Sequence, residues 1–552
     1  MTTLPETVQE YSIHAAHSFI QTAVFVDDRI YERGSASANE PKKVVVPKSR
    51  KRVSRSASVE SGEDTVSVEI VTEEDPAPDS YDIVNSFAKK QIVCSLYQPK
   101  KTAKVSPASD IFPLCRAADV VIVDWDLFGD KGQRALELID GLISQAVWDV
   151  PEQLRLILVY TQEANLFGVA NDIYEKVHPG VGDSFKPLEE EDGLAFHTEN
   201  SRIAVLGKPG RERADTDPRH IVDESDLADI TVREFAKLAS GILQAATLLG
   251  LAEIRKNSRK ILSRFNSDLD SAFLTHLAMC LPEEDASSHV IPLLVSEIEA
   301  VLEDALSSPL MPENLIKDWC KDVWEPGDHL ANILGDGNNY RAIGEAILTD
   351  GFSGARSVHT CIPKISSNGN IRNASKIFLK SADDNANHRF AHLMSSRTFY
   401  GGAPKNLTLG TIVFDEKNKR YLLCLQPVCD SVRIKCKRSF LFVEFDTTVG
   451  TGNNAATHAV VKSGGDVLEL FYQSKSYRSV ISTFRPTMGK DQVMATIEEN
   501  EPPTFVDTSE ENYRWIDQLK TAHAQRAVEH FASDLSRVGL TESEWLRLLK
   551  KK

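Results

Sequence analysis

The strongest constraint on the fold is a series of five short apolar runs, rich in Val, Ile and Leu, in the first 210 residues. They are AVFVDD (23–28), QIVCSLY (91–97), ADVVIVDWD (118–126), LRLILVYT (154–161) and RIAVLGKPG (202–210). Segments with helical periodicity separate most of them. Strands that are apolar almost throughout are typical of a parallel sheet covered by helices on both faces. The first part of the chain is therefore predicted to be an α/β domain with a doubly wound, five-stranded parallel sheet.

The hydropathy pattern changes after this domain. Residues 226–254 have the periodicity of one long helix, and helical patterns continue to about residue 350. Residues 405–485 alternate apolar and polar positions between turn residues, as antiparallel strands do. The predicted parts are the α/β domain over 1–250, a helical region over 251–390, a smaller, mostly antiparallel β domain over 391–490 and C-terminal helices over 491–552.

A segment of biased composition follows the first apolar run. Residues 42–55 carry seven bases and no acid, whereas residues 60–79 carry eight acids and no base. Ser, Pro and Gly are frequent among the other residues. Such a segment cannot bury enough apolar surface to fold, so it predicts a disordered insertion over 33–80. It is interpreted as a solvated loop, with a docking or regulatory arm as the alternative.

Charge and cysteine content limit the class of protein. The chain has 63 Lys and Arg against 80 Asp and Glu, a formal net charge of −17. Since duplex DNA is bound mainly through Lys and Arg, nucleic acid is not the expected partner. No apolar run is long enough for a membrane span and no secretory signal is found, so a cytoplasmic protein without a membrane partner is expected. The eight cysteines are expected to be buried free thiols, with a reactive thiol as the alternative at Cys429.

Reactive polar residues follow four of the five apolar runs. Asp27 and Asp28 end the first run and Asp124 the third, while Thr161 ends the fourth and Lys208 the fifth. Because ligands of a doubly wound sheet bind outside the carboxyl ends of its strands, these side chains are expected to converge. Crowded carboxylates repel one another, and Mg²⁺ relieves that repulsion while it binds phosphate oxygens. The cluster therefore predicts an aspartyl phosphate formed on Asp124, with Lys208 stabilising the phosphoryl group.

The motifs VFVDDRI, VVIVDWDLFGDKG, LVYTQE and VLGKP, in this order, resemble the receiver domains of two-component response regulators. The resemblance implies a flavodoxin-like receiver fold over roughly residues 10–250, with Asp124 as the phosphoacceptor. It also implies a Mg²⁺ site in which Asp28, Asp124 and the backbone carbonyl of Asp126 bind the metal directly and Asp27 acts through water.

The same resemblance implies that Thr161 and Lys208 contact the phosphoryl group and that the peptide bond to Pro209 is cis. The sequence departs from the family at Val205, where receivers commonly have Tyr or Phe three residues before the lysine. This puts the usual switch between the threonine and the aromatic residue in doubt.

As a response regulator, the chain would accept a phosphoryl group from a partner histidine kinase and would not itself be an enzyme. Its large insertion and its unassigned C-terminal half resemble the receiver protein without an effector enzyme in the Detocs anti-phage phosphorelay. That resemblance implies a phosphate buffer or signal transmitter, with a second receiver–effector protein as a further partner.

Two other functions stay open. One is an effector enzyme whose activity lies in the C-terminal region and is controlled by phosphorylation. The other is a DNA-binding transcriptional regulator that uses residues 526–551, although a plain helical hairpin is favoured there. His388 and His392 are four residues apart and share a face if helical, but without a third ligand they are interpreted as surface or packing residues.

Overall fold

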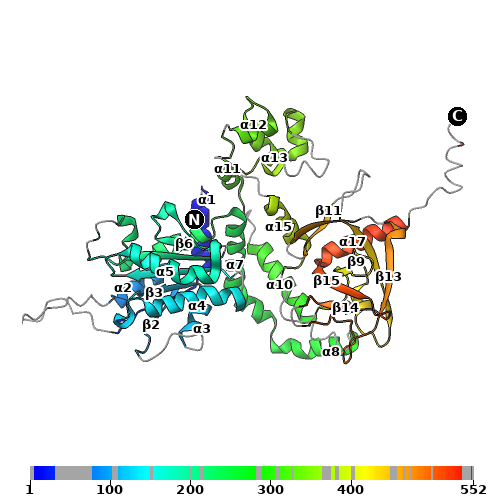
Figure 1. Cartoon of the computed structure of the whole chain (residues 1–552), viewed down its shortest axis with the longest axis horizontal. Coiled ribbons are helices and arrows are strands. Elements are labelled where there is room, and N and C mark those ends of the chain that lie inside the picture. Colours follow the sequence, from blue (N-terminus) through cyan, green and yellow to red (C-terminus); the bar gives the residue numbers. More distant parts are fainter. Residues whose placement is uncertain are drawn as a thin grey trace, which may run out of the picture. The chain divides into compact units, whose positions relative to one another are not determined.

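The fold is described from a computed structural model of the chain. The described residues are 5, 7–31, 78–101, 110–149, 153–198, 200–211, 213, 216–280, 289–305, 311–321, 323–325, 327–362, 374–379, 384–398, 405–447, 457–463, 466–472, 475–498, 501–536 and 549. Almost all of the insertion predicted over 33–80 lies outside them, as do the last residues of the helix pair considered for DNA binding. The chain forms two compact units, Met1–Lys321 and Asp322–Lys552 (Figure 1).

The first unit contains the predicted parallel sheet. Its strands pair in the order β2-β1-β3-β4-β7, and every pairing among these five is parallel. They are β1 (Thr22–Val26), β2 (Val93–Tyr97), β3 (Val120–Val123), β4 (Arg155–Thr161) and β7 (Ser201–Gly207). Two short antiparallel strands, β6 (Ala195–His197) and β5 (Lys186–Pro187), extend the sheet beyond β7. The α/β prediction is confirmed, and the sheet has seven strands because the chain folds back on itself before β7.

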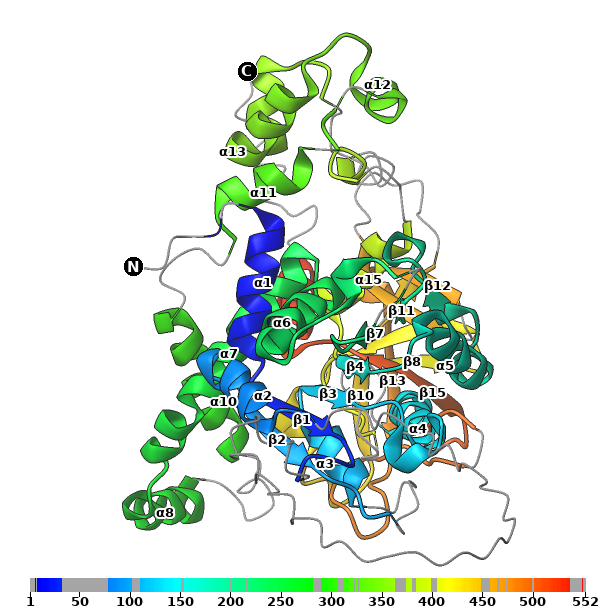
Figure 2. The ribbon, with the colours of Figure 1, turned by 90° about the vertical axis from the view of Figure 1, so that its left-hand side faces the viewer.

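Helices cover both faces of this sheet, which explains why its strands are mostly apolar. One face carries α1 (Val8–Phe19), α2 (Ser80–Lys89), α6 (Leu227–Leu238) and α7 (Ile242–Arg264), and the other α3 (Ile111–Ala117), α4 (Gln133–Asp149) and α5 (Leu166–Val181) (Figure 2). Within β1, Phe25 belongs to the core under α1 and α6, whereas Val24 and Val26 belong to the core under α4 and α5. Successive side chains of a strand point to opposite faces, so the strands of a sheet buried on both sides are mostly apolar, and the buried exceptions here, such as Arg155 and Arg202, lie near the strand starts.

The single helix predicted over 226–254 is two helices. It breaks at Ala239–Gly241, where Gly241 adopts an extended conformation (φ −80°, ψ 143°) as the N-cap of α7. Glycine is a poor helix former, and here the chain turns so that α6 and α7 both pack on α1. The unit continues through α8 (Asp270–Cys280), α10 (Val290–Ala305) and α11 (Glu313–Cys320).

The second unit joins helices to a separate antiparallel sheet, as predicted. The strands pair in the order β11-β12-β10-β9-β8-β15-β14, and β13 pairs with β10. They are β8 (Thr411–Asp415), β9 (Arg420–Cys424), β10 (Arg438–Asp446), β11 (Thr457–Ser463), β12 (Asp466–Tyr472), β13 (Ser479–Phe484), β14 (Thr504–Val506) and β15 (Asn512–Gln518). The helices are α12 (Asp328–Leu334), α13 (Tyr340–Val358), α15 (Asp384–Ser395), α16 (Val428–Ser431) and α17 (Thr521–Leu535).

The segment predicted as C-terminal helices, 491–552, supplies two of these strands before α17 begins. In β15 the pairing with β8 shifts between Trp515 and Asp517, and the buried positions are Tyr513, Ile516 and Asp517. A β-bulge of this kind interrupts the two-residue period by which a strand is recognised in a sequence. The helical prediction was wrong here for that reason.

Thiol burial also differs from the expectation. Cys115, Cys320 and Cys424 are buried, but Cys429 and Cys436 are exposed. Cys429 lies in the four-residue helix α16, which leaves the sheet after β9 instead of continuing its core. No helix in the described part of the chain is long and apolar enough to cross a membrane.

Candidate functional site

The structure brings the five strand-end residues together at the carboxyl edge of the parallel sheet. Asp27 and Asp28 follow β1, Asp124 follows β3, Thr161 is the last residue of β4 and Lys208 follows β7. Backbone hydrogen bonds continue the sheet to these positions, from Asp124 N to Val26 O (2.8 Å) and from Lys208 N to Thr161 O (2.7 Å). The exposed fractions of all five residues lie between 0% and 9%. Their backbone positions are therefore set by the rigid sheet and not by a mobile loop.

The ammonium of Lys208 lies between two carboxylates. Its Nζ donates to Asp124 Oδ1 at 2.6 Å and to Asp27 Oδ2 at 3.1 Å. The Tyr160 ring lies 5.4 Å from the same Nζ, measured to its centroid, so the cation also contacts an aromatic face. Burial by itself would lower the pKa of Lys208, but Asp124 and Asp27 outweigh it and leave that pKa raised. The lysine is held in its charged form.

Asp28 has one oxygen that is bound and one that is not. Its Oδ2 accepts a hydrogen bond from Phe128 N at 2.8 Å, and Phe128 has a left-handed backbone (φ 63°) that turns this N–H toward the carboxylate. Its Oδ1 is buried and has no hydrogen-bond partner. A buried carboxylate oxygen without a partner is costly, which suggests a place for a ligand.

The carboxylates carry more negative charge than the lysine neutralises. Burial raises the pKa of Asp124 to about 6, with Asp27 adding to the effect and Lys208 opposing it. Burial also raises the pKa of Asp28, against the hydrogen bond from Phe128. Three carboxylates face one ammonium, so the cluster bears two net negative charges when fully ionised. Its environment favours the arrival of a cation or a proton.

The donor set fits Mg²⁺, a hard cation that prefers carboxylate and carbonyl oxygens and keeps several waters. The free Oδ1 of Asp28 and the Asp124 carboxylate are the candidate side-chain ligands. Among the described residues, no group of three or more His, Cys, Asp or Glu side chains is placed to hold a metal ion, so the fit rests on two carboxylates with a carbonyl and water. The Asp126 carboxylate accepts from Lys131 N (2.8 Å), so this side chain is engaged away from the cluster. Asp126 could contribute only through its backbone carbonyl, as the resemblance to receiver domains implies.

Arginine side chains connect the loops that carry Thr161 and Lys208. Arg213 donates from Nε to the Glu163 carbonyl (2.9 Å) and from its terminal nitrogens to the carbonyls of Lys208 (2.8 Å) and Thr161 (3.2 Å). Arg211 donates to the Gln162 carbonyl at 3.0 Å. The sequence did not indicate Arg213, because it lies in a polar loop with no periodic pattern. Only the fold places its guanidinium over three carbonyls.

The residues around Thr161 differ from the pattern expected from the resemblance to receiver domains. Thr161 Oγ1 accepts from Glu163 N at 3.1 Å. Val205, at the usual aromatic position, is buried in the core under α4 and α5. The aromatic ring near Lys208 is instead that of Tyr160, whose hydroxyl donates to the Val222 carbonyl at 2.7 Å. The described peptide bonds, that of Pro209 included, are all trans, so the cis bond expected there is not found.

The histidine pair of the second unit lies elsewhere and is used structurally. His388 and His392 both lie on α15, and their Nε2 atoms are 2.7 Å from Glu469 Oε1 and 3.0 Å from Asp517 Oδ2. These carboxylates belong to β12 and β15, so the pair fastens α15 to the sheet. This agrees with the interpretation as packing residues.

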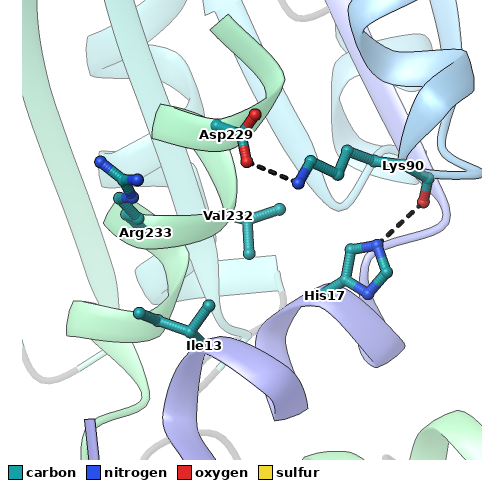
Figure 3. Close-up of a pocket in the computed structure, with 6 residues that line it drawn as sticks. All are labelled: Ile13, His17, Lys90, Asp229, Val232 and Arg233. Carbon is teal, nitrogen blue, oxygen red and sulfur yellow. Dashed lines mark hydrogen bonds and ion pairs between the residues drawn. The ribbon is translucent and has the colours of Figure 1, made fainter. Parts of the chain in front are cut away.

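A shallow pocket of about 250 Å³ lies among α1, α6 and the end of α2 (Figure 3). Its lining is Ile13, His17, Lys90, Asp229, Val232 and Arg233, and it includes none of the strand-end residues. Lys90 Nζ pairs with Asp229 Oδ1 at 2.5 Å, and His17 Nε2 is 3.1 Å from the Lys90 carbonyl. Three of its polar side chains, those of Lys90, Asp229 and His17, therefore already have partners.

Comparison with protein families gives one match. Residues 19–213 match the family model described as "Response receiver domain". This match supports a receiver domain over these residues. The match covers 195 of the 552 residues and spans all five parallel strands and the strand-end cluster. Comparisons with curated proteins and with solved structures gave no significant match. The receiver assignment thus rests on the family match and on the strand order β2-β1-β3-β4-β7, which is that of flavodoxin-like sheets.

Proposed function

We propose that the receiver domain accepts a phosphoryl group on Asp124 in a Mg²⁺-dependent reaction. The observation that carries the proposal is the buried cluster in which Lys208 bridges Asp27 and Asp124 while Asp28 keeps a free oxygen. Asp124 Oδ1 is bound to Lys208, whereas Oδ2 has no partner among the described residues. With a pKa of about 6, the carboxylate is ionised near neutral pH, as a nucleophile must be.

The transfer forms one bond and breaks one. Asp124 Oδ2 attacks the phosphorus of a phosphohistidine, the P–N bond breaks, and the imidazole leaves with the electron pair of that bond. Lys208 is placed to stay with the phosphoryl oxygens and offset their charge, and the Thr161 hydroxyl can donate to one of them. Bound Mg²⁺ would supply further neutralisation of the phosphoryl charge, held by Asp28, Asp124 and the Asp126 carbonyl.

The test uses the full chain and a small phosphodonor such as acetyl phosphate. Wild type with Mg²⁺ should gain one phosphoryl group, measured by intact mass and by retardation in a phosphate-affinity gel. Asp124→Asn should gain none, and chelation of Mg²⁺ should prevent labelling of the wild type. Asp172→Asn is the matched control, because Asp172 is exposed on α5 and lies outside the cluster. Equal labelling of Asp124→Asn and wild type would show that the acceptor is another residue.

We further propose a histidine kinase as the phosphodonor and a cytoplasmic signalling role, without enzymatic turnover by the chain itself. A receiver domain supports a phosphodonor of this kind, and its presence supports signalling over catalysis. Phosphotransfer from a purified kinase, tested with the same pair of variants, would measure the rate. Turnover of nucleotides or nucleic acids by the phosphorylated chain would contradict the non-enzymatic role and favour an effector enzyme. Sequence-specific DNA binding would favour the transcriptional regulator.

An anti-phage phosphorelay is the setting we propose, as a phosphate buffer or signal transmitter beside a second receiver–effector protein. Its support is the resemblance in organisation, a receiver with a long charged insertion followed by a second unit. Phage challenge of cells that express the complete relay would test it. Asp124→Asn should cause toxicity without infection if the chain is a buffer, and loss of protection if it is a transmitter. Unchanged growth and protection would refute both roles.

A further inference from the structure

The helices that follow the receiver domain carry an unusually large exposed apolar surface. Eleven large apolar side chains between Leu251 and Val295 are more than a third exposed. They lie on the second half of α7, on the turn that follows it (Phe265 and Leu269), on α8 and on the first half of α10 (Figure 1). Leu262 is 70% exposed, Leu274 62% and Met279 80%. Scattered exposed apolar residues are normal, but so many within one stretch of the chain indicate an interaction surface.

The apolar stripe of α10 is only half covered. Ile291, Leu294 and Val295 recur at the spacing of one helix face with Val301 and Leu302. The C-terminal part of this face packs on α7, since Val301 is buried and Leu302 lies 3.7 Å from the Cβ position of Gly250. The N-terminal part does not, and Ile291 is 63% exposed and Val295 54%. A helix of this length is marginal alone, so an uncovered apolar face calls for a partner.

Charge on the hairpin of α7 and α10 indicates what that partner is. From Leu251 to Arg264, α7 has five bases and one acid, a net charge of +4, whereas α10 has four acids and no base, a net charge of −4. Arg264 pairs with Glu297 inside the hairpin. Arg255 and Lys256 are also paired, with Asp119 and Glu253. The charges left without an ion pair to another described residue include those of Arg259 and Lys260 on α7 and of Glu299 and Glu303 on α10. A uniformly acidic or basic partner would match only one of the two helices.

We propose that this face is the dimer interface between two copies of the chain. In a two-fold dimer the same surface meets itself, so the basic row of one copy faces the acidic row of its partner, and the contact forms twice. Two helical hairpins joined in this way bury their apolar faces as a four-helix bundle does. The exposed residues of α8 extend the apolar contact. The interface uses none of the strand-end residues and does not depend on the phosphoacceptor role.

The first experiment measures the mass of the full chain in solution by light scattering and sedimentation at micromolar concentration. We expect twice the chain mass of 61.2 kDa. Leu294→Glu should raise the dimer dissociation constant by more than about tenfold, because it places an unpaired charge in the interface. Val358→Glu, at a more exposed apolar position in the second unit (73% against 41% for Leu294), should leave the constant unchanged.

Charge reversal separates contacts between copies from contacts within one. The double variants Arg259→Glu/Lys260→Glu and Glu299→Lys/Glu303→Lys should each be mainly monomeric. An equimolar mixture of the two should dimerise. In the mixed dimer, the reversed α7 of one variant faces the reversed α10 of the other, and the two unchanged helices face each other, so both contacts again join opposite charges. A monomeric wild type would overturn the proposal. So would a mixture that fails to dimerise, or a Leu294→Glu variant that lowers thermal stability without changing mass, which would mean that the face is covered within the chain.

Discussion

Replacing Asp124 with Asn should stabilise the receiver domain when no metal is present. Burial raises the pKa of Asp124 from 3.8 to about 6, so the folded state holds this carboxylate ionised at a cost. The difference corresponds to about 3 kcal/mol at 1.36 kcal/mol per pKa unit. A neutral amide removes that cost but weakens the bond to Lys208, which keeps Asp27 as its second partner. We therefore expect a gain in the free energy of unfolding of about 1–3 kcal/mol at pH 8.

The pH dependence of unfolding tests independently whether the ionised Asp124 carboxylate destabilises the folded state. A carboxyl whose pKa is higher folded than unfolded binds more protons in the folded state between those two values. In the wild type, this group should therefore make the receiver more stable as pH falls from above 6 toward 4. Asp124→Asn should lose that contribution, so the stability difference between variant and wild type should shrink across the same window.

The assay is urea unfolding in buffer that contains a metal chelator, followed by amide hydrogen exchange of peptides from β1 and β3. This readout reports on the first unit separately from the second. Asp172→Asn serves as the surface control. Added Mg²⁺ should stabilise the wild type more than Asp124→Asn and reduce or reverse their order. An Asp124→Asn variant less stable than wild type at pH 8 without metal would refute the reasoning that burial of this charge is unfavourable.

Three further predictions follow from single contacts. Asp28→Asn should weaken Mg²⁺ binding by more than about tenfold, because it removes the negative charge of the carboxylate whose Oδ1 has no partner. Titration calorimetry measures the affinity, and an unchanged affinity would exclude Asp28 as a ligand. Arg213→Met should destabilise the loops at the ends of β4 and β7 by about 2 kcal/mol, since a charged donor to three carbonyls is lost. Amide hydrogen exchange should become faster near Glu163 and stay unchanged in the second unit. Burial lowers the pKa of His458 to about 4 from 6.5, with His523 adding to the effect, so the second unit should lose about 3 kcal/mol as pH falls from 6.5 to 4. His458→Phe should flatten this loss in urea unfolding, and an unaltered pH profile would exclude His458 as its source.

The sequence by itself determined the five parallel strands of the first sheet and the identity of the strand-end residues, but not its two short antiparallel strands. A strand buried on both faces is apolar along most of its length, so its pattern is visible without knowledge of its neighbours. Charged residues directly after such strands fall at one edge of a parallel sheet wherever the strands lie within it. Asp27, Asp124 and Lys208 could therefore be assigned to one site before any distance was known, and the structure places them within hydrogen-bonding distance.

Only the tertiary structure decided how these groups share their partners. The free oxygen of Asp28 depends on the backbone turn at Phe128, and the position of Arg213 depends on two loops that meet only in the fold. The bulge in β15 and the exposure of Cys429 likewise follow from pairing and chain direction, which a local pattern does not encode. The uncovered face of α10 is also a feature that only the tertiary structure decides. Its apolar stripe is plain in the sequence, but which half of it lacks a partner depends on where α7 packs.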